Sequence, residues 1–159
     1  GTVEAFAGLQ DLFAIATHAS GKVDIREGDD LLSVVDGQNV GRDHYLGVYG
    51  QPGTKMFKCM IRWRDWKYIY MANGGLEQLF NLSTDPDEIQ DQSKINPEVC
   101  GSLRKMVITD LSSRRGTEDA IQSNDLVFFT PSSRPLERIY QFDRSRGISK
   151  FPEDPRDCL

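Results

Sequence analysis

Hydrophobic residues near the start of the chain recur at every third or fourth position. Over residues 2–17 this spacing places them on one face of a helix. Thr2 can cap the first turn, and Ser20-Gly21 can end the helix. The pattern therefore predicts an N-terminal helix over residues 2–17, with an apolar face made of Val3, Phe6, Leu9, Leu12, Phe13 and Ala16.

Between residues 44 and 82 the pattern changes to short runs in which the side chains alternate, as they do along a strand. In one run, Trp66, Tyr68 and Tyr70 share a face. Residues 73–75 read Asn-Gly-Gly, a strong hairpin signal because these residues tolerate a positive φ. Short consecutive strands joined by turns predict an antiparallel meander. We expect its four strands at residues 44–49, 55–62, 66–71 and 76–82.

A second amphipathic segment follows the strands. Asn96-Pro97 is typical of a helix start, and the apolar stripe after it predicts a helix over residues 97–113. This helix can cover one face of the sheet. The sequence therefore predicts an α+β fold: a four-stranded antiparallel sheet packed by a C-terminal helix and preceded by an N-terminal helix, within one subdomain over residues 1–114.

Residues 115–159 have a different character, because their apolar runs are short and four prolines interrupt the rest. We interpret them as an extended tail that packs on the subdomain or on a missing partner domain. One strand is expected around residues 126–129.

Composition narrows the range of functions. The chain has 159 residues, of which 38% are hydrophobic and 27% charged, as in one globular domain. Its net charge of −5 argues against binding to nucleic acid, whose protein partners usually carry a basic face. No apolar run approaches the ~20 residues that cross a bilayer. Cys59, Cys100 and Cys158 are too sparse for a disulfide framework.

The sequence contains few signals of a catalytic or metal-binding site. His18 and His44 are the only histidines, and neither has a metal-ligand spacing. The acidic clusters lack the alternating oxygen ligands of a calcium loop, and the chain has no phosphate loop or nucleophile elbow. We therefore expect no catalytic residue and no metal site in this chain.

An ordered series of motifs nevertheless points to a family. Residues 60–69 read MIRWRDWKYI, residues 74–82 read GGLEQLFNL, and residues 85–88 read DPDE, before Asn96-Pro97. Their order and spacing resemble the C-terminal subdomain of the type I sulfatase family. Residues 9–13, LQDLF, are similar to the helix that leads from the family's catalytic domain. The resemblance covers roughly residues 3–113, and Phe80-Asn81 stands where Tyr-Asp is usual.

The resemblance implies a mechanism that lies elsewhere. Sulfatases use a formylglycine, made from the first residue of a Cys/Ser-x-Pro-x-Arg signature, and a calcium ion held by Asp and Asn side chains. Both belong to the larger N-terminal domain, and this sequence has no such signature. We therefore expect an excised piece that is inactive alone, with the missing catalytic domain as its partner. Family members usually work in the periplasm, the secretory route or lysosomes.

Within such a parent protein, this subdomain would brace the catalytic domain and line the cleft for a sulfated substrate. The loop over residues 49–56 is the candidate wall, with Tyr49, Gln51 and Lys55 as substrate-binding residues. Arg62 and Arg64 are second choices, because guanidinium groups suit sulfated or carboxylated sugars.

Two other functions stay open. One is a phosphate or phosphonate ester hydrolase of the same alkaline-phosphatase-like superfamily, with Thr or Ser as the upstream nucleophile. The other is a stand-alone carbohydrate-binding module that uses Trp63 and its neighbours. A subdomain separated from its partner should also expose apolar residues on the first helix and the tail, and should self-associate.

Overall fold

A computed structural model describes residues 5–22 and 28–132 of the chain. Residues 1–129 form one compact unit and residues 130–159 a second. The expected start of the first helix at Thr2 lies outside the described residues, as does the expected tail from residue 133 onward. Among the helices of the described part, none combines the length and hydrophobicity that crossing a membrane requires.

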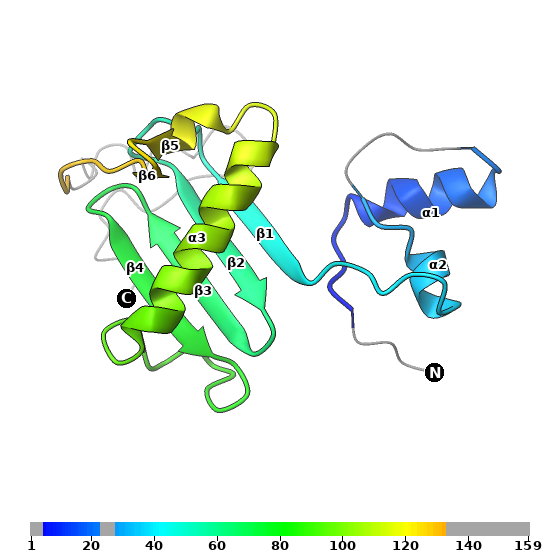
Figure 1. Cartoon of the computed structure of the whole chain (residues 1–159), viewed down its shortest axis with the longest axis horizontal. Helices are drawn as coiled ribbons and strands as arrows, with labels where there is room; N and C mark the ends of the chain where they lie inside the picture. Colours follow the sequence, from blue (N-terminus) through cyan, green and yellow to red (C-terminus); the bar gives the residue numbers. More distant parts are fainter. Residues whose placement is uncertain (1–4, 23–27, 133–159) are drawn as a thin grey trace, which may run out of the picture. The chain divides into compact units, whose positions relative to one another are not determined.

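Four strands form a single antiparallel sheet in the order β1-β2-β3-β4 (Figure 1). They are β1 (His44–Tyr49), β2 (Lys58–Trp63), β3 (Trp66–Met71) and β4 (Leu76–Asn81). The register aligns Leu46, Ile61, Tyr68 and Leu79 in one row across the sheet. Since side chains alternate along each strand, all four point to the same face. The meander and the α+β class are confirmed.

Strand β2 begins three residues later than expected, because the chain is still turning before it. The amide of Phe57 donates to the carbonyl of Thr54 at 3.0 Å, which closes a turn over residues 54–57. Gly50 has a φ of 79°, and a Cβ there would lie 2.3 Å from the Met56 carbonyl oxygen. Only glycine allows this close approach, so the β1–β2 connection is tight rather than a continued strand.

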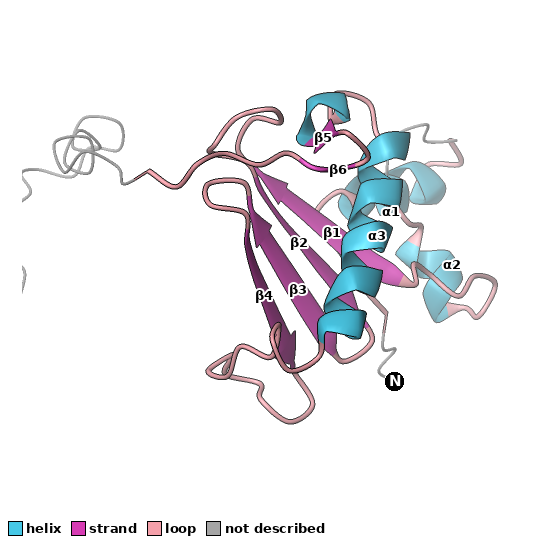
Figure 2. Cartoon of the chain, turned by 60° about the vertical axis from the view of Figure 1, so that its left-hand side comes forward, coloured by secondary structure: helices cyan, strands magenta, loops and turns pink. Residues whose placement is uncertain are grey.

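Helix α3 (Pro97–Ser113) lies along one face of the sheet (Figure 2). Its buried side chains are Cys100, Leu103, Val107 and Leu111. These pack against the row that contains Ile61 and Tyr68, which makes this layer the core of the molecule. The helix predicted over residues 97–113 is thereby confirmed.

One carboxylate connects this helix to the sheet. Glu77 on β4 accepts a bond from the Tyr68 hydroxyl at 2.5 Å and from the Nε of Arg104 on α3 at 2.7 Å. A second guanidinium nitrogen of Arg104 also bonds to Glu77. Burial and the Glu77 carboxylate both raise the pKa of Tyr68, which favours the protonated hydroxyl that donates to Glu77.

After α3, the chain adds a short helix, η1 (Glu118–Ala120), and a two-residue hairpin of β5 (Ile121–Gln122) and β6 (Asp125–Leu126). The Tyr70 hydroxyl donates to the carbonyl of Val127 at 2.9 Å. Phe129 then forms an isolated bridge with Asn73. The strand expected around residues 126–129 is therefore mostly wrong: only Leu126 belongs to a strand, and Phe129 makes a single bridge.

The N-terminal helix is shorter than predicted. Helix α1 covers Asp11–Ala19, and the described residues before it are not helical. Gly8 has low helix propensity, and its amide donates to the Asp11 carboxylate at 2.6 Å, which stabilises a turn in place of an earlier helical start. Leu9, Leu12 and Phe13 are 83%, 60% and 54% exposed, so the predicted apolar stripe is not covered.

Asp11 connects α1 to the chain on both sides of helix α2 (Leu31–Val35). Its carboxylate is fully buried and accepts the amide of Asp29 at 2.8 Å. The Arg42 guanidinium bonds to both Asp11 and Asp29. Burial alone would raise the pKa of Asp11, but the amides of Gly8 and Asp29 together with Arg42 outweigh it and lower that pKa.

The first test concerns the carboxylate under α3. Replacing Glu77 by glutamine should lower the free energy of unfolding by about 2 kcal/mol, because Arg104 loses its charged partner. Urea denaturation followed by tryptophan fluorescence measures this change. The exposed Asp87→Asn is the control and should stay within about 0.5 kcal/mol of the wild type. Equal stability of all three proteins would show that the cluster contributes nothing.

The second test concerns Asp11. The substitution Asp11→Asn removes the charge that Arg42 and two amides bind, so the amides of residues 29–34 should exchange with solvent about tenfold faster or more. Peptide-resolved hydrogen exchange measures this, with the exposed Asp36→Asn as control. Unchanged exchange in the Asp11→Asn variant would contradict the role of the carboxylate.

The same group predicts a pH dependence. Because the pKa of Asp11 in the folded protein lies below its ordinary value of 3.8, the charged carboxylate stabilises the fold fully above that pH. This contribution is lost as the pH falls below 3.8 through the folded-state pKa. Wild type and Asp11→Asn should therefore differ in Tm at neutral pH and converge in acid. A constant difference down to the acid limit of folding would refute the assignment.

Candidate functional site

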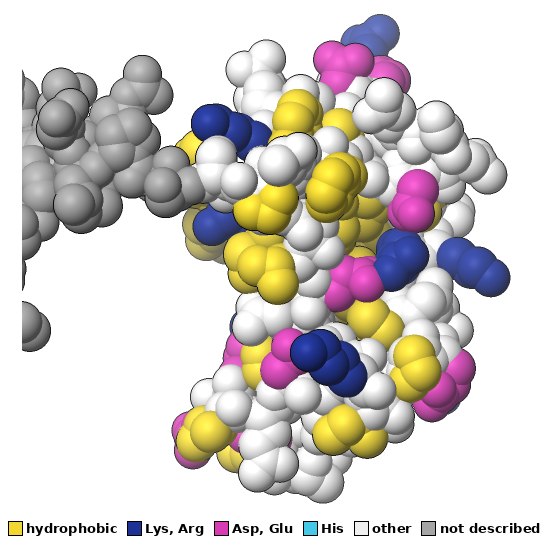
Figure 3. Space-filling view, turned by 90° about the vertical axis from the view of Figure 1, so that its left-hand side faces the viewer, with side chains coloured by type: hydrophobic (Ala, Val, Ile, Leu, Met, Phe, Trp, Pro, Cys, Tyr) yellow, Lys and Arg dark blue, Asp and Glu magenta, His cyan; other side chains and the backbone are white. Residues whose placement is uncertain are grey.

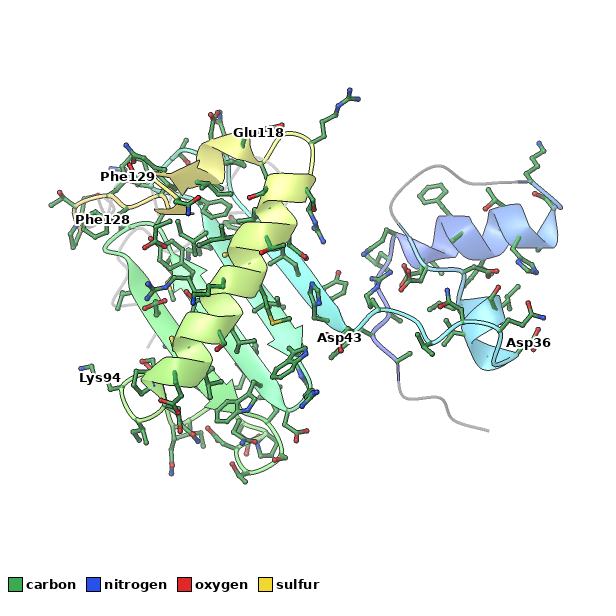
Figure 4. All side chains as sticks on the ribbon, viewed as in Figure 1. Asp36, Asp43, Lys94, Glu118, Phe128 and Phe129 are labelled. Atoms are coloured by element: carbon green, nitrogen blue, oxygen red, sulfur yellow. The ribbon has the colours of Figure 1, made fainter. Side chains whose placement is uncertain are left out.

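A polar pocket lies beside the start of β1. It has a volume of about 320 Å³, and its lining comes from three parts of the chain: the segment around α1 and α2, the first residues of β1, and the end of α3. The lining residues are Gln10, Gly28, Asp29, Arg42, His44, Tyr45, Leu46, Asp110, Ser113 and Arg114. Figure 4 labels Asp43, which immediately precedes β1.

His44 is the central titratable group of this pocket. Its Nε2 lies 3.0 Å from a carboxylate oxygen of Asp110 on α3. Its Nδ1 is buried and has no hydrogen-bond partner in the described part of the chain. The nearest carboxylate oxygen to Nδ1, from Asp43, is 3.9 Å away. The ring is thus held by one bond, and its other nitrogen is buried from solvent.

The pocket can offer hydrogen bonds but shows no activated nucleophile. Ser113 is its only hydroxyl of the serine or threonine type, and that hydroxyl donates to the carbonyl of Asp110 at 2.8 Å. Arg42 is already paired with two carboxylates. In the sequence, His44 has no metal-ligand spacing and is not brought together with Asp110. They are 66 positions apart in the chain, and nothing in the sequence indicated that they would meet.

The three preferred site residues of the sequence analysis lie together at the β1–β2 connection. Tyr49 is 65% exposed at the end of β1, and Gln51 and Lys55 are exposed in the loop. Thr54 stabilises the loop, because its hydroxyl donates a hydrogen bond to the carbonyl of Gln51 at 2.7 Å. The loop is therefore an ordered surface that presents one aromatic and two polar side chains.

The two second choices lie at the opposite end of β2. The Arg64 guanidinium stacks over the Trp63 ring at 4.3 Å, and Arg62 donates to the carbonyl of Arg64 at 3.2 Å. A six-residue strand is ~17 Å long, so these arginines and the β1–β2 loop cannot line one small site. The pocket contains none of the five predicted residues.

The two tryptophans, Trp63 and Trp66, pack against the core and are poorly placed to stack on a sugar. Trp63 and Trp66 are partly buried against the core. The indole nitrogen of Trp63 donates to the Asp43 carboxylate at 3.0 Å, and Arg64 covers a ring face. A sugar that stacked on Trp63 would have to displace that guanidinium, which weakens the carbohydrate-binding alternative.

The acidic segment after β4 has a scaffold role. The Asp85 carboxylate accepts hydrogen bonds from the amides of Ile89 and Gln90 at 3.1 and 2.8 Å, which stabilises the turn after β4. Lys67 on β3 bonds to both carboxylate oxygens of Glu88, at 2.7 and 2.6 Å. These groups are engaged with one another and hold the loop to β3.

Metal ligation has no support within residues 5–22 and 28–132. These residues contain no group of three or more His, Cys, Asp or Glu side chains that could hold an ion. The calcium ion that the resemblance implies therefore has no ligand set among the described residues. Cys59 and Cys100 are buried free thiols, and burial raises their pKa values to about 12 and about 11.

Comparison with known proteins gives both sequence and fold matches. No family model matches the chain. A stretch of 46 residues is 48% identical to arylsulfatase K of Bos taurus, which amounts to 28% of this chain and 8% of that protein. A solved 2-O GAG sulfatase matches 69% of this chain with a TM-score of 0.58 and 18% identity.

A phosphonate monoester hydrolase of Agrobacterium radiobacter matches 84% of the chain, with a TM-score of 0.57 and 20% identity. Identities this low establish the fold alone. The matched part spans about a quarter of the sulfatase structure and 30% of the hydrolase. The chain thus resembles part of the sulfatases in its 46-residue match and in its fold, as its motifs predicted.

Proposed function

We propose that this chain is the C-terminal part of a sulfuric ester hydrolase. The observation that carries the proposal is the coincidence of the motif series at residues 60–88 with a four-stranded sheet and covering helix that sulfatase structures share. The identical stretch in arylsulfatase K supports the same family. The described residues show no activated nucleophile and no metal cluster, so the catalytic chemistry would come from the remainder of the protein.

In this proposal, the chain braces the catalytic part and completes its substrate cleft. Leu9, Leu12 and Phe13 on and before α1 form an exposed apolar stripe that suits contact with another part of the protein. The firm loop with Tyr49, Gln51 and Lys55 supplies the cleft wall. Arg62 and Arg64 are weaker candidates, because both are engaged in local contacts. The protein would work in the periplasm, the secretory route or lysosomes.

Turnover tests the assignment directly. We expect the isolated chain to release no sulfate from 4-nitrocatechol sulfate, even with calcium, and the polypeptide that joins it to its upstream part to do so. An upstream Cys/Ser-x-Pro-x-Arg signature should accompany that activity. Turnover by the isolated chain would sink the proposal. Preferential turnover of a phosphonate monoester, with an upstream Thr or Ser nucleophile, would favour the related hydrolase instead.

The cleft wall has its own test. In the joined polypeptide, Tyr49→Ala removes an aromatic contact of about 0.5–1.5 kcal/mol, which corresponds to a rise in KM of roughly twofold to tenfold. The kcat should change less, because the side chain would not touch the reacting atoms. Ile95→Ala is the control, since Ile95 is 74% exposed in another loop. An unchanged KM in Tyr49→Ala would remove this loop from the cleft.

A further inference from the structure

The β1–β2 loop (residues 50–57) and η1 meet at one end of the sheet. Figures 1 and 2 both show this loop at the end where β5 and β6 lie, and η1 directly precedes β5. Gly53 is the point of contact: a Cβ there would lie 2.8 Å from the Cβ of Asp119 and 3.3 Å from the Asp119 carbonyl oxygen. Carbon atoms pack at about 3.5–4.0 Å. The loop therefore reaches η1 this closely only because residue 53 has no side chain.

This contact is not a consequence of the backbone conformation at Gly53. Its φ of 74° favours glycine in any surroundings. Gly37, after α2, has nearly the same φ, 72°, but a Cβ on it would have no atom within 4 Å. The two glycines therefore share one backbone requirement, and of the two only Gly53 combines it with a close neighbour from a distant part of the chain.

The short helix η1 is held in place at both of its ends. Ala120, its last residue, is fully buried, and the carbonyl of Ala120 accepts the amide of Val127 at 2.9 Å. The hydroxyl of Thr117, just before η1, donates to the carbonyl of Leu111 on α3 at 2.6 Å. These bonds attach η1 to the last turn of α3 and to the segment after β6. Asp119 lies between the two attachments.

The loop is held from within on the side that enters β2. Phe57 is fully buried, and its amide donates to the carbonyl of Thr54 at 3.0 Å. The contact of Gly53 with η1 adds a second fixed point, nearer to β1. Together the two points set the position of the exposed Gln51 in the loop and of Tyr49 at the end of β1.

Side chains of every kind mix at this end of the molecule. Figure 3 keeps it at the top, and on the side shown there hydrophobic, basic and acidic side chains lie next to one another. No single charge covers that surface, so a ligand bound there would be recognised by individually placed side chains. Such recognition is sensitive to displacement, because a hydrogen bond weakens steeply once its geometry changes. The position of the loop therefore matters as much as its composition.

We propose that Gly53 and Asp119 are positioning residues for the substrate: η1 supports the β1–β2 loop through this contact and so fixes the placement of Tyr49 and Gln51. The inference rests on the proposed function, in which the loop lines the cleft. Neither positioning residue has to touch the substrate. Because their effect passes through the loop, it should appear as a change in substrate binding with little change in the chemical step.

Crowding this contact tests the proposal in the joined polypeptide. Gly53→Ala should raise KM by roughly twofold to tenfold, the range expected from loss of one aromatic contact of the loop, with a smaller change in kcat. Gly37→Ala is the matched control: it introduces the same backbone strain into open space, so KM should stay at the wild-type value. Adding Asp119→Gly to Gly53→Ala should return KM toward that value, because the new Cβ then takes the space that the Asp119 side chain leaves.

Hydrogen exchange tests the support without any turnover. In the isolated chain, Gly53→Ala should make the amides of residues 51–57 exchange about tenfold faster or more, whereas Gly37→Ala should leave them unchanged. Asp119→Gly alone removes the contact without crowding the loop and should accelerate the same exchange. This second variant keeps the test independent of how well Gly53→Ala folds, which urea denaturation measures.

Each other outcome has a definite meaning. Unchanged loop exchange in both Gly53→Ala and Asp119→Gly overturns the support by η1. A rise in KM that Gly37→Ala shares, or that Asp119→Gly does not reverse, overturns the contact as its cause. Faster exchange with an unchanged KM overturns the positioning role. Absence of turnover by the wild-type joined polypeptide rejects the proposed function alone, because exchange in the isolated chain still decides whether η1 supports the loop.

Discussion

The packing of α3 on one row of the sheet is the interaction on which the rest of the structure depends. Leu46, Ile61, Tyr68 and Leu79 come from four different strands and meet only when all three strand pairings are in register. A slip of one residue would turn a strand's core side chains to the other face. Burial of this row under Leu103, Val107 and Leu111 therefore fixes the register.

Hydrogen bonds and ion pairs connect the segments that the apolar core does not hold together. Glu77 connects β4 to α3 through Arg104, and Lys67 holds the segment after β4 through Glu88. The Asp11 carboxylate connects α1 to the segment before β1 by accepting a hydrogen bond from Arg42. Each carboxylate is at least partly buried, and each accepts several hydrogen bonds, which offset the loss of hydration. The result is a firm scaffold in which few charged groups are available for chemistry.

This scaffold is consistent with the proposal that the catalytic chemistry lies in another part of the protein and that this chain supports it. A sulfatase needs a nucleophile and concentrated positive charge around the leaving oxygen atoms. The described chain instead offers an exposed stripe at α1 and an ordered loop after β1. Both are features of a part that supports and delimits a site. The polar pocket at His44 adds hydrogen-bonding capacity without an activated nucleophile.

The sequence by itself determined the meander, the helix over residues 97–113 and the family resemblance, because alternation, turn residues and local motifs are encoded within short windows. It misjudged the start of α1, since the bond from Gly8 to the Asp11 carboxylate competes with the helical pattern. Only the tertiary structure decided that His44 meets Asp110 and that the predicted loop residues and arginines lie at opposite ends of β2. These features depend on contacts between distant segments, which periodicity cannot specify.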